Sequence, residues 1–358
     1  MKKITSYHKI FYLLPWILLL VLSACKHDDL QIFKANDNFR PGFDFVKNNY
    51  DLSIFAAAIE KSGLAEQLNT AGPFTILAPA NAAFNVMGIN SPADLDKMNP
   101  DTLKFLVQRH ILNERLQIQD IPRNSADVRY RTLASTQVYT STAFNGSQTD
   151  TYFDGSYVRR QDVTIANGTL HVLDRVMKAD ANTTVQDWLA KRPEYSTLVA
   201  GLKKFGFWDE LATEGPYTVL APKNEVFEAA GLTPAVINSL DTSRYIGARL
   251  FGCYVMPKKH LFVSDLVVFS IINGDYFYYY AIPNDTYIMT ITAGRINNTA
   301  GDYSLGYGVS VRSKKNYPYD IISNVTGNNQ KGLNNLVDNG LVQDLGGIMI
   351  MPDQAIKR

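Results

Sequence analysis

The pattern of apolar and polar positions predicts the same pair of elements at two places in the chain. Apolar residues recur at a spacing of i, i+3, i+4 and i+7, which places them on one face of a helix. These residues are Leu52, Phe55, Ala56 and Ile59 in the first copy, and Tyr195, Leu198, Val199 and Leu202 in the second. A short apolar strand follows each helix, at Phe74–Leu77 and Tyr217–Leu220. Gly-Pro precedes each strand and Ala-Pro follows it, and proline is expected at strand boundaries because it lacks a backbone N–H.

The two copies form an internal repeat. The sequence GPFTILAPANAAF at Gly72–Phe84 returns as GPYTVLAPKNEVF at Gly215–Phe227, an offset of 143 residues. The alignment holds without a gap over Ser53–Gly88 and Ser196–Gly231, where 15 of 36 positions are identical. Self-similarity of this kind indicates one structural unit built twice.

Asparagines mark the expected starts of further helices. Asn81 and Asn224 are predicted to be the N-caps of the short helices that carry Phe84 and Phe227. Asn99-Pro100-Asp101 predicts another helix start, because asparagine caps, proline suits the first turn and the acid favours the helix dipole. The apolar stripe of that helix comprises Leu103, Leu106, Val107 and His110.

The segment from Tyr130 to Val176 has the pattern of β-hairpins. It alternates Thr, Val, Tyr and Phe, and is interrupted by Asn145-Gly146, Asp154-Gly155 and Asn167-Gly168. Each unit therefore has helices first and a small sheet afterwards. The predicted fold class is α+β, built twice.

Three segments together resemble a known family. Thr75–Phe84, His110–Leu112 and Asn167–Asp174 look like the two boxes, the central histidine and the last strand of fasciclin domains. The resemblance implies two tandem fasciclin-like domains, 45–180 and 182–358, each with a helical half and a small β-sheet or β-sandwich wedge. It assigns structural roles to Thr75, Pro79, Asn81, Phe84, His110 and His171 in the first copy, and to Pro222, Asn224 and Phe227 in the second.

The second copy departs from the family pattern in its latter half. At the offset of 143, His110 corresponds to Cys253. If Asn339-Gly340 is the counterpart of Asn167-Gly168, His171 corresponds to Gln343 and the offset becomes 172. The second unit then holds 29 extra residues, which we expect as a β-rich insertion within 262–336.

The amino terminus predicts export and a lipid anchor. Residues 1–24 combine three lysines with the apolar run Ile10–Leu22, which is too short to span a membrane and suits a signal peptide. Leu22-Ser23-Ala24-Cys25 resembles the lipobox of bacterial lipoproteins, which implies acylation of Cys25. Residues 25–44 are then a tether. The Lys26–Asp29 segment resembles an export tag, so we expect an outer-membrane lipoprotein facing the exterior, with a solvated linker as the alternative.

Composition and motifs disfavour catalysis and nucleic-acid binding. The net charge of +1 gives no basic excess for a nucleic-acid partner. The five histidines are scattered, and the sequence has no compact metal-ligand set and no nucleophile or phosphate-binding motif. His110 lies on an apolar helix stripe, which favours a hydrogen-bonded role in the core. Cys253 has apolar neighbours, which favour a buried structural thiol. We therefore expect no enzyme, no cofactor and no metal.

A run of aromatic residues within the predicted insertion has two interpretations. In a strand, Tyr276, Tyr278 and Tyr280 would share one face, and Phe277 and Tyr279 the other. Ordinary cross-strand packing would explain the run. The alternative is a recognition surface on Tyr276, Tyr278 and Tyr280, because tyrosine offers a flat apolar ring and a hydroxyl to sugars or proteins.

Two functions follow from these expectations. The first is a non-catalytic surface lipoprotein that binds proteins or glycans and serves adhesion, as fasciclin domains do. The second is an accessory subunit of an outer-membrane uptake complex of the SusC/SusD type. A hydrolase is disfavoured, although the two carboxylates of a glycosidase need not be neighbours in sequence.

Overall fold

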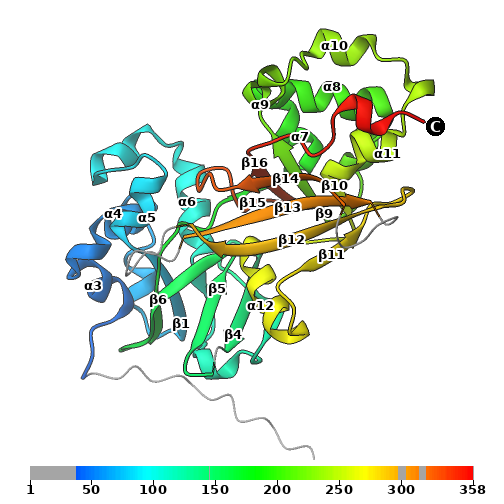
Figure 1. Cartoon of the computed structure of the whole chain (residues 1–358). Helices are drawn as coiled ribbons and strands as arrows, with labels where there is room; N and C mark the ends of the chain where they lie inside the picture. Colours follow the sequence, from blue (N-terminus) through cyan, green and yellow to red (C-terminus); the bar gives the residue numbers. More distant parts are fainter. Residues whose placement is uncertain (1–37, 145, 297–303, 314–319, 358) are drawn as a thin grey trace, which may run out of the picture. The chain divides into compact units, whose positions relative to one another are not determined.

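A computed structural model describes residues 38–144, 146–296, 304–313 and 320–357. The predicted signal peptide, Cys25 and most of the predicted tether lie outside the described residues. The first helix, α3 (Gly42–Lys47), begins within the segment 25–44 that we expected to be a tether (Figure 1). Phe43 of this helix is buried in the core, so the folded part starts earlier than the sequence indicated.

The first repeat has helices packed on one side of a mixed sheet. Helices lie both before and after strand β1 (Phe74–Pro79) in the chain, and the hairpins come after them. The helices are α3, α4 (Ser53–Lys61), α5 (Asn81–Val86) and α6 (Pro100–Arg109). The remaining strands are β2 (Ile111–Leu112), β3 (Ser125–Arg131), β4 (Gln137–Phe144), β5 (Thr149–Phe153), β6 (Ser156–Ile165) and β7 (Gly168–Leu173).

Strand β1 separates two apolar clusters of the first repeat. Its alternate side chains point to opposite faces of the sheet, as strand geometry requires. Ile76 and Ala78 lie in the cluster formed with the helices. Leu77 lies in the cluster formed with the hairpins, together with Phe153 and Leu173. The buried face of the helices and the inner face of the hairpins are therefore held by one central strand.

The strand order explains where proline is tolerated. The sheet has the order β2-β1-β7-β6-β5-β4-β3, with β1 and β7 parallel and in register from Phe74–Gly168 to Pro79–Leu173. Strand β1 is two residues longer than predicted and ends with Pro79. The short β2 pairs only with Thr75 and Ile76, so it has ended before Pro79, where a proline has no N–H to offer.

The second repeat reproduces the first at the predicted offsets. Helix α7 (Val185–Ala190), strand β9 (Tyr217–Pro222) and helix α9 (Asn224–Ala229) match α3, β1 and α5 with an offset of 143, and the second predicted strand likewise extends to its proline. Helix α8 (Ser196–Phe205) starts at the same offset from α4. Strand β16 (Gly340–Leu345) matches β7 with an offset of 172 and pairs in parallel with β9. The internal repeat and the Asn167–Asn339 correspondence are confirmed.

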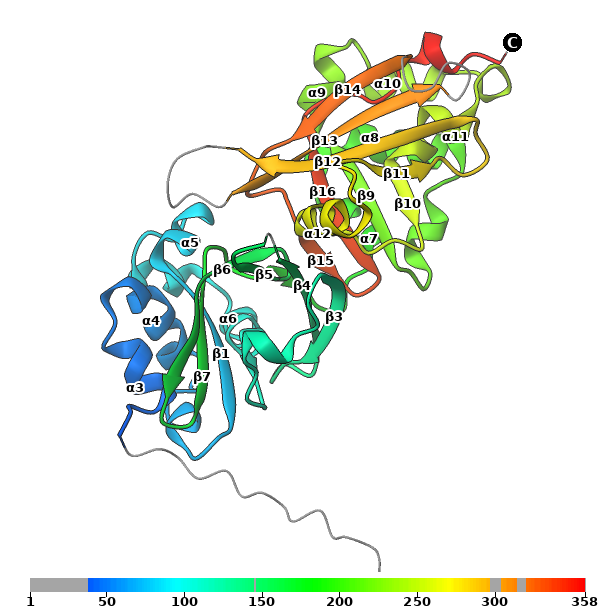
Figure 2. The same ribbon diagram turned by 60° about the horizontal axis from the view of Figure 1, so that its bottom comes forward.

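The latter half of the second repeat differs in topology. Its sheet has the order β10-β9-β16-β15-β8, and a separate four-stranded sheet has the order β11-β12-β13-β14. Helix α12 (Val263–Asn273) precedes that sheet and packs against β3 and β4 of the first repeat as well as against β12 (Figure 2). The other elements are β8 (Ala179–Asp180), α10 (Pro234–Ser239), α11 (Gly247–Leu250), β10 (Val255–Pro257), β11 (Tyr278–Ala281), β12 (Tyr287–Arg295), β13 (Leu305–Ser313), β14 (Ile321–Gly327) and β15 (Asn335–Val337). The chain has the predicted α+β class.

Candidate functional site

The motif asparagines connect helices rather than capping their own. Ala80 and Lys223 occupy the N-cap positions of α5 and α9, so the N-cap prediction for Asn81 and Asn224 was wrong. The Asn81 Oδ1 accepts a hydrogen bond from the Ile54 N–H at the start of α4, at 3.0 Å. Its Nδ2 donates to the Tyr50 carbonyl and the Ser53 hydroxyl. Asn81 thereby satisfies a free N–H of another helix.

The second repeat contains the same connection, atom for atom. The Asn224 Oδ1 accepts from the Thr197 N–H at 2.9 Å, and its Nδ2 donates to the Pro193 carbonyl and the Ser196 hydroxyl. The motif phenylalanines that follow are buried in the core, with Phe84 near Phe55 and Phe227 near Phe251.

Threonine and asparagine side chains close two further loops in both repeats. The Thr75 hydroxyl donates to the Glu114 carbonyl and accepts from the Leu116 N–H. The Asn167 side chain accepts from the Gly42 N–H at 2.9 Å and donates to the Leu68 and Thr70 carbonyls. The equivalents Thr218 and Asn339 make the corresponding bonds in the second repeat. The sequence analysis assigned Thr75 to the fold and matched Asn339 with Asn167, but it did not single out Thr218, although Thr218 lies at the repeat offset of 143.

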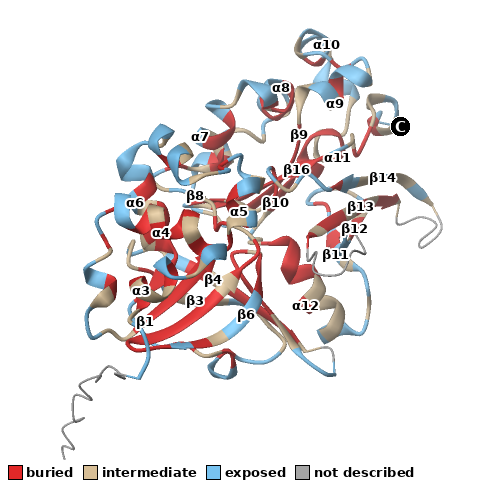
Figure 3. Cartoon of the chain, turned by 90° about the vertical axis from the view of Figure 1, so that its left-hand side faces the viewer, coloured by how far each residue is buried: buried red, intermediate tan, exposed pale blue. Residues whose placement is uncertain are grey.

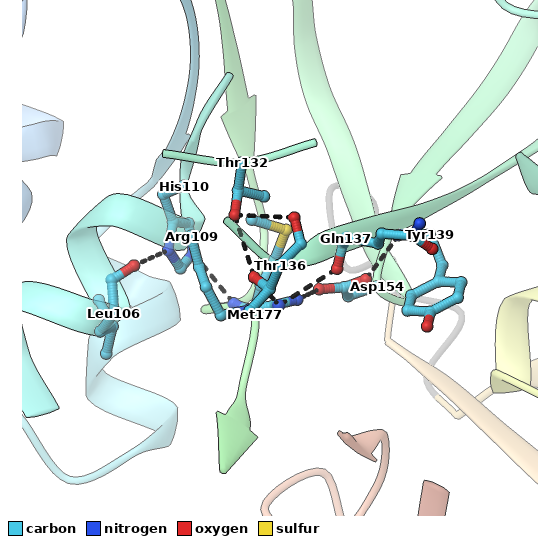
Figure 4. A network of polar contacts seen from close by, with 9 residues as sticks. All are labelled: Leu106, Arg109, His110, Thr132, Thr136, Gln137, Tyr139, Asp154 and Met177. Carbon is cyan, nitrogen blue, oxygen red and sulfur yellow. Dashed lines mark hydrogen bonds and ion pairs between the residues drawn. The ribbon is translucent and has the colours of Figure 1, made fainter. Parts of the chain in front are cut away.

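His110 is buried and holds two backbone groups. Its Nδ1–H donates to the Leu106 carbonyl at 2.8 Å, and its Nε2 accepts from the Met177 N–H at 3.1 Å (Figure 4). Burial lowers the pKa of His110 to about 3, so the ring is neutral at physiological pH. The predicted core role of His110 is confirmed.

The counterpart of His110 is Tyr254, not Cys253. Ile111 pairs with Ile76 and Val255 pairs with Val219, so the second repeat gains one residue before this strand and the offset becomes 144. The Tyr254 hydroxyl accepts from the Met349 N–H at 3.0 Å, which is the bond that the His110 Nε2 makes to the Met177 N–H. Cys253 is buried as predicted, with its thiol directed to the Leu250 carbonyl, and burial raises the pKa of that thiol.

His171 is a second neutral histidine with the opposite tautomer. Its Nδ1 accepts from the Asp162 N–H, and its Nε2–H donates to the Leu116 carbonyl at 3.0 Å. Burial lowers the pKa of His171. Gln343 replaces it as predicted, because its Nε2 donates to the Leu261 carbonyl and its Oε1 accepts from the Asn334 N–H. A residue that can be replaced by an amide serves hydrogen bonding and not proton transfer.

A buried ion pair ties α6 to the hairpin of the first repeat. The Arg109 guanidinium forms an ion pair with Asp154 and donates to the Thr136 hydroxyl at 2.8 Å and the Gln137 carbonyl (Figure 4). The Tyr139 N–H donates to the other Asp154 oxygen at 2.8 Å. The hydrogen bonds of this network run to neighbouring protein groups, which marks it as structural. The sequence carries no spacing signal for it, because the partners are 45 residues apart.

The aromatic run does not form the predicted face of Tyr276, Tyr278 and Tyr280. Strand β11 begins only at Tyr278, and Tyr276 precedes it with 84% of its surface exposed. Tyr280 is 7% exposed and lies in the core, while Tyr278 packs against Phe269 at 5.3 Å between ring centroids. The exposed rings are Tyr276, Phe277 and Tyr279, which we call the aromatic patch. Packing thus explains Tyr278 and Tyr280, and the solvent-facing rings are mostly those of the opposite face.

The two repeats are in direct contact through aromatic and hydroxyl side chains. Tyr139 of β4 packs on His260, with ring centroids 4.1 Å apart, and on Phe262 at the start of α12. The Ser141 and Ser264 hydroxyls share a hydrogen bond of 3.2 Å. Figure 3 shows buried residues running through this region. Burial lowers the pKa of His260 to about 4.

No group of three or more His, Cys, Asp or Glu side chains in the described part of the chain is placed to hold a metal ion. Within the same ranges, no helix has the length and apolar character needed to cross a bilayer.

Comparison with known proteins shows the family to which this chain belongs. The fasciclin domain profile matches residues 50–179 and 193–277, more than half of the chain, and the chain therefore belongs to the fasciclin domain family. It is 31% identical to human periostin over 192 residues, covering 51% of this chain and 21% of periostin. It is 27% identical to fasciclin-1 of Drosophila melanogaster over 270 residues, covering 72% of this chain and 39% of that protein. The chain thus spans well under half the length of these relatives.

A solved structure, the FAS1 domain pair of the insect cell adhesion molecule fasciclin I, shares 19% sequence identity. The match covers 85% of this chain and 98% of that chain, with a TM-score of 0.37.

Proposed function

We propose that this protein is a non-catalytic adhesion or ligand-binding lipoprotein, held in the outer membrane by acylated Cys25 and facing the cell exterior. The observation that carries the proposal is the use of the motif polar residues. Asn81, Thr75, His110 and His171 are engaged with backbone groups inside the fold. All four have hydrogen-bonding counterparts in the second repeat, at Asn224, Thr218, Tyr254 and Gln343. This leaves surface recognition as the function that a tandem fasciclin protein can serve here.

The aromatic patch is the proposed contact surface for an extracellular protein or glycan. Tyr276, Phe277 and Tyr279 are exposed, and the rings of Phe277 and Tyr279 lie 6.1 Å apart. Flat rings beside one another suit stacking on sugar rings or packing at a protein interface. The Tyr279 hydroxyl is oriented by Asp275, at 2.9 Å, so this ring is fixed before any partner arrives.

Binding to an array of matrix proteins and polysaccharides tests the contact surface. We expect the double variant Tyr276→Ser/Tyr279→Ser to lose at least about tenfold in affinity for the ligand found, because buried aromatic anchors dominate interface energies. Tyr50→Ser is the matched control, since Tyr50 is 88% exposed and lies in the first repeat. Equal binding by the double variant and the parent protein would reject the patch, and an array without any ligand would reject the function.

The anchor is tested separately on cells. Metabolic labelling with an alkyne fatty acid is expected to mark the parent protein and not Cys25→Ala, and protease added to intact cells is expected to digest it. The accessory role in a SusC/SusD-type complex makes a different prediction. Native purification in mild detergent would then recover a large β-barrel partner with the parent protein.

A further inference from the structure

A partly open cavity of about 210 Å³ lies where the two repeats meet, within the described part of the chain. We call it the junction cavity. The first repeat contributes Met87 of the segment after α5, the β5–β6 turn and the segment after β7, and the second repeat contributes Leu305 of β13 and the segment before β15. Pockets for drug-sized ligands are larger, at roughly 300–1,000 Å³. The junction cavity therefore suits a ligand about the size of an amino acid or a monosaccharide.

Lys178 at this cavity is held by uncharged groups, whereas Arg175 forms an ion pair with Asp174 at 3.5 Å. The Lys178 ammonium donates to the Lys331 carbonyl at 2.7 Å and to the Asn335 Oδ1 at 3.0 Å, which are uncharged oxygen atoms. Among the described residues, no carboxylate lies within ion-pair distance of Lys178. Asp154 of the lining is ion-paired with Arg109, and Asp344 is ion-paired with Lys223.

Arg175, which also lines this cavity, contains an unsatisfied donor. Its Nη2 donates to the Ser304 hydroxyl and the Gln330 Oε1, and its Nη1 lies 3.5 Å from Asp174. Its Nε is buried and, among the described residues, has no hydrogen-bond partner. A buried N–H without an acceptor is destabilising by about 1–3 kcal/mol unless something else supplies the acceptor.

Part of the remaining lining is apolar, beside the carboxylates of Asp154 and Asp174. Met87, Val176, Leu305 and Leu333 line the cavity, so a ligand with only polar groups would leave part of the surface unmatched. From this juxtaposition we infer that the junction cavity binds a small carboxylate whose carbon skeleton is partly apolar, with the carboxylate between Lys178 and Arg175. This site goes beyond the proposed surface adhesion and does not depend on it.

The protonation of Lys178 is expected to respond to such a ligand. Burial lowers the pKa of its ammonium to about 8. A bound carboxylate would favour the protonated amine, as an opposite charge does at short distance. Binding must therefore weaken as the pH rises through 8, although the carboxylate itself does not titrate there.

Equilibrium binding to the full-length protein in mild detergent tests the site with two matched pairs of probes. Phenylacetate is compared with phenylacetamide, and glucuronate with glucose, so that each acid has a neutral partner of similar shape. We expect one of the acids to bind at least about tenfold tighter than its neutral partner, as charge-assisted hydrogen bonds are stronger than neutral ones. The pair that binds tells whether the skeleton is that of an apolar acid or of an acidic sugar.

Lys178→Met keeps the length of the side chain and removes its charge. We expect it to lower the affinity for the acid at least about tenfold, whereas Lys104→Met, on the exposed face of α6, leaves the affinity unchanged. If Lys178→Met does not fold, the pH dependence of binding to the parent protein still tests the inference, because the affinity for the acid must fall between pH 7 and pH 9. Absence of binding by both acids, equal binding of acid and neutral partner, or a flat pH profile would overturn the inference.

Discussion

His110 and Tyr254 accept the same backbone hydrogen bond with different chemical groups. The imidazole nitrogen and the phenol oxygen each satisfy a methionine N–H, at Met177 and Met349, that would otherwise be buried without a partner. A residue position in this fold is therefore defined by the hydrogen bond it must complete. The type of side chain can change when its acceptor atom arrives at the same place.

Replacing Tyr254 by phenylalanine tests this interpretation. The variant keeps the ring in the core and removes the acceptor, so we expect a loss of about 1–3 kcal/mol in the free energy of unfolding. Urea denaturation followed by circular dichroism measures the loss. Tyr276→Phe removes a hydroxyl from an exposed ring and should leave stability within about 0.5 kcal/mol of the parent protein.

Burial of Asp265 makes its contribution to the stability of the fold depend on pH. It is buried near the start of α12, and burial raises the pKa of its carboxyl to about 7, although the Phe262 N–H donates to it at 2.9 Å. A folded-state pKa above the ordinary value of about 4 means that the protonated form is favoured by folding, and this stability is lost as the pH rises through 7.

We therefore expect Asp265→Asn to reduce the loss of stability between pH 6 and pH 8. The amide retains an oxygen acceptor for the Phe262 N–H and carries no charge to bury. Chemical denaturation of both proteins at the two pH values gives the comparison, and an identical pH dependence would show that Asp265 does not titrate in this range.

At the scale of elements, the sequence predicted what local pattern and repetition determine. The helix faces, the proline-bounded strands and the Asn167-Gly168 turn follow from spacing and backbone chemistry, and each is present. The predictions that were wrong concern positions whose role is set by tertiary contacts. Asn81 was expected to cap its own helix and reaches α4 instead, and the one-residue shift that brings Tyr254 to the place of His110 is visible only in strand pairing.

The aromatic patch was missed for a similar reason. Alternation along Tyr276–Tyr280 separates two faces, but the sequence does not say which face meets the core. In the structure Tyr280 faces inward, and β11 starts two residues after Tyr276. The junction cavity had no sequence signal at all, because its lining comes from three segments far apart in the chain, at 83–87, 154–178 and 304–334.

The glycines that begin β7 and β16, Gly168 and Gly340, have no room for a side chain. A Cβ at Gly168 would lie 1.8 Å from the Phe74 carbonyl oxygen, across the parallel pair with β1. Gly168→Ala must therefore push the two strands apart, and we expect a loss of at least about 2 kcal/mol in the free energy of unfolding. Gly294→Ala is the control, because a Cβ there meets no heavy atom within 4 Å. Equal stability of the two variants would contradict the strand register.

At the scale of the whole molecule, His260 links stability to pH across the contact between repeats. Among the described residues its ring nitrogens have no hydrogen-bond partner, and the ring lies between Tyr139 and Phe262. Its pKa of about 4 in the folded protein is below the unfolded value of about 6.5, so folding favours the neutral ring. Its contribution to stability is complete above pH 6.5 and is lost as the pH falls towards 4.

His260→Phe is expected to stabilise the protein more at pH 5 than at pH 7.5. The substituted ring keeps the stacking contacts and has no nitrogen to protonate. Urea denaturation at both pH values measures the difference, with Tyr279→Phe as a control of an exposed ring outside this contact. A gain that is the same at both pH values would show that His260 contributes through packing alone.

The parallel pairing of β1 with β7 has a mechanical consequence when the chain is pulled at its two ends. Tension along the chain reaches β1 from its amino-terminal end and β7 from its carboxyl-terminal end. Two parallel strands pulled in this way slide past one another, so the hydrogen bonds along their six paired residues carry the load together. The equivalent pair β9 and β16 repeats the arrangement. Each repeat is thus built to shear and not to unzip when it is stretched.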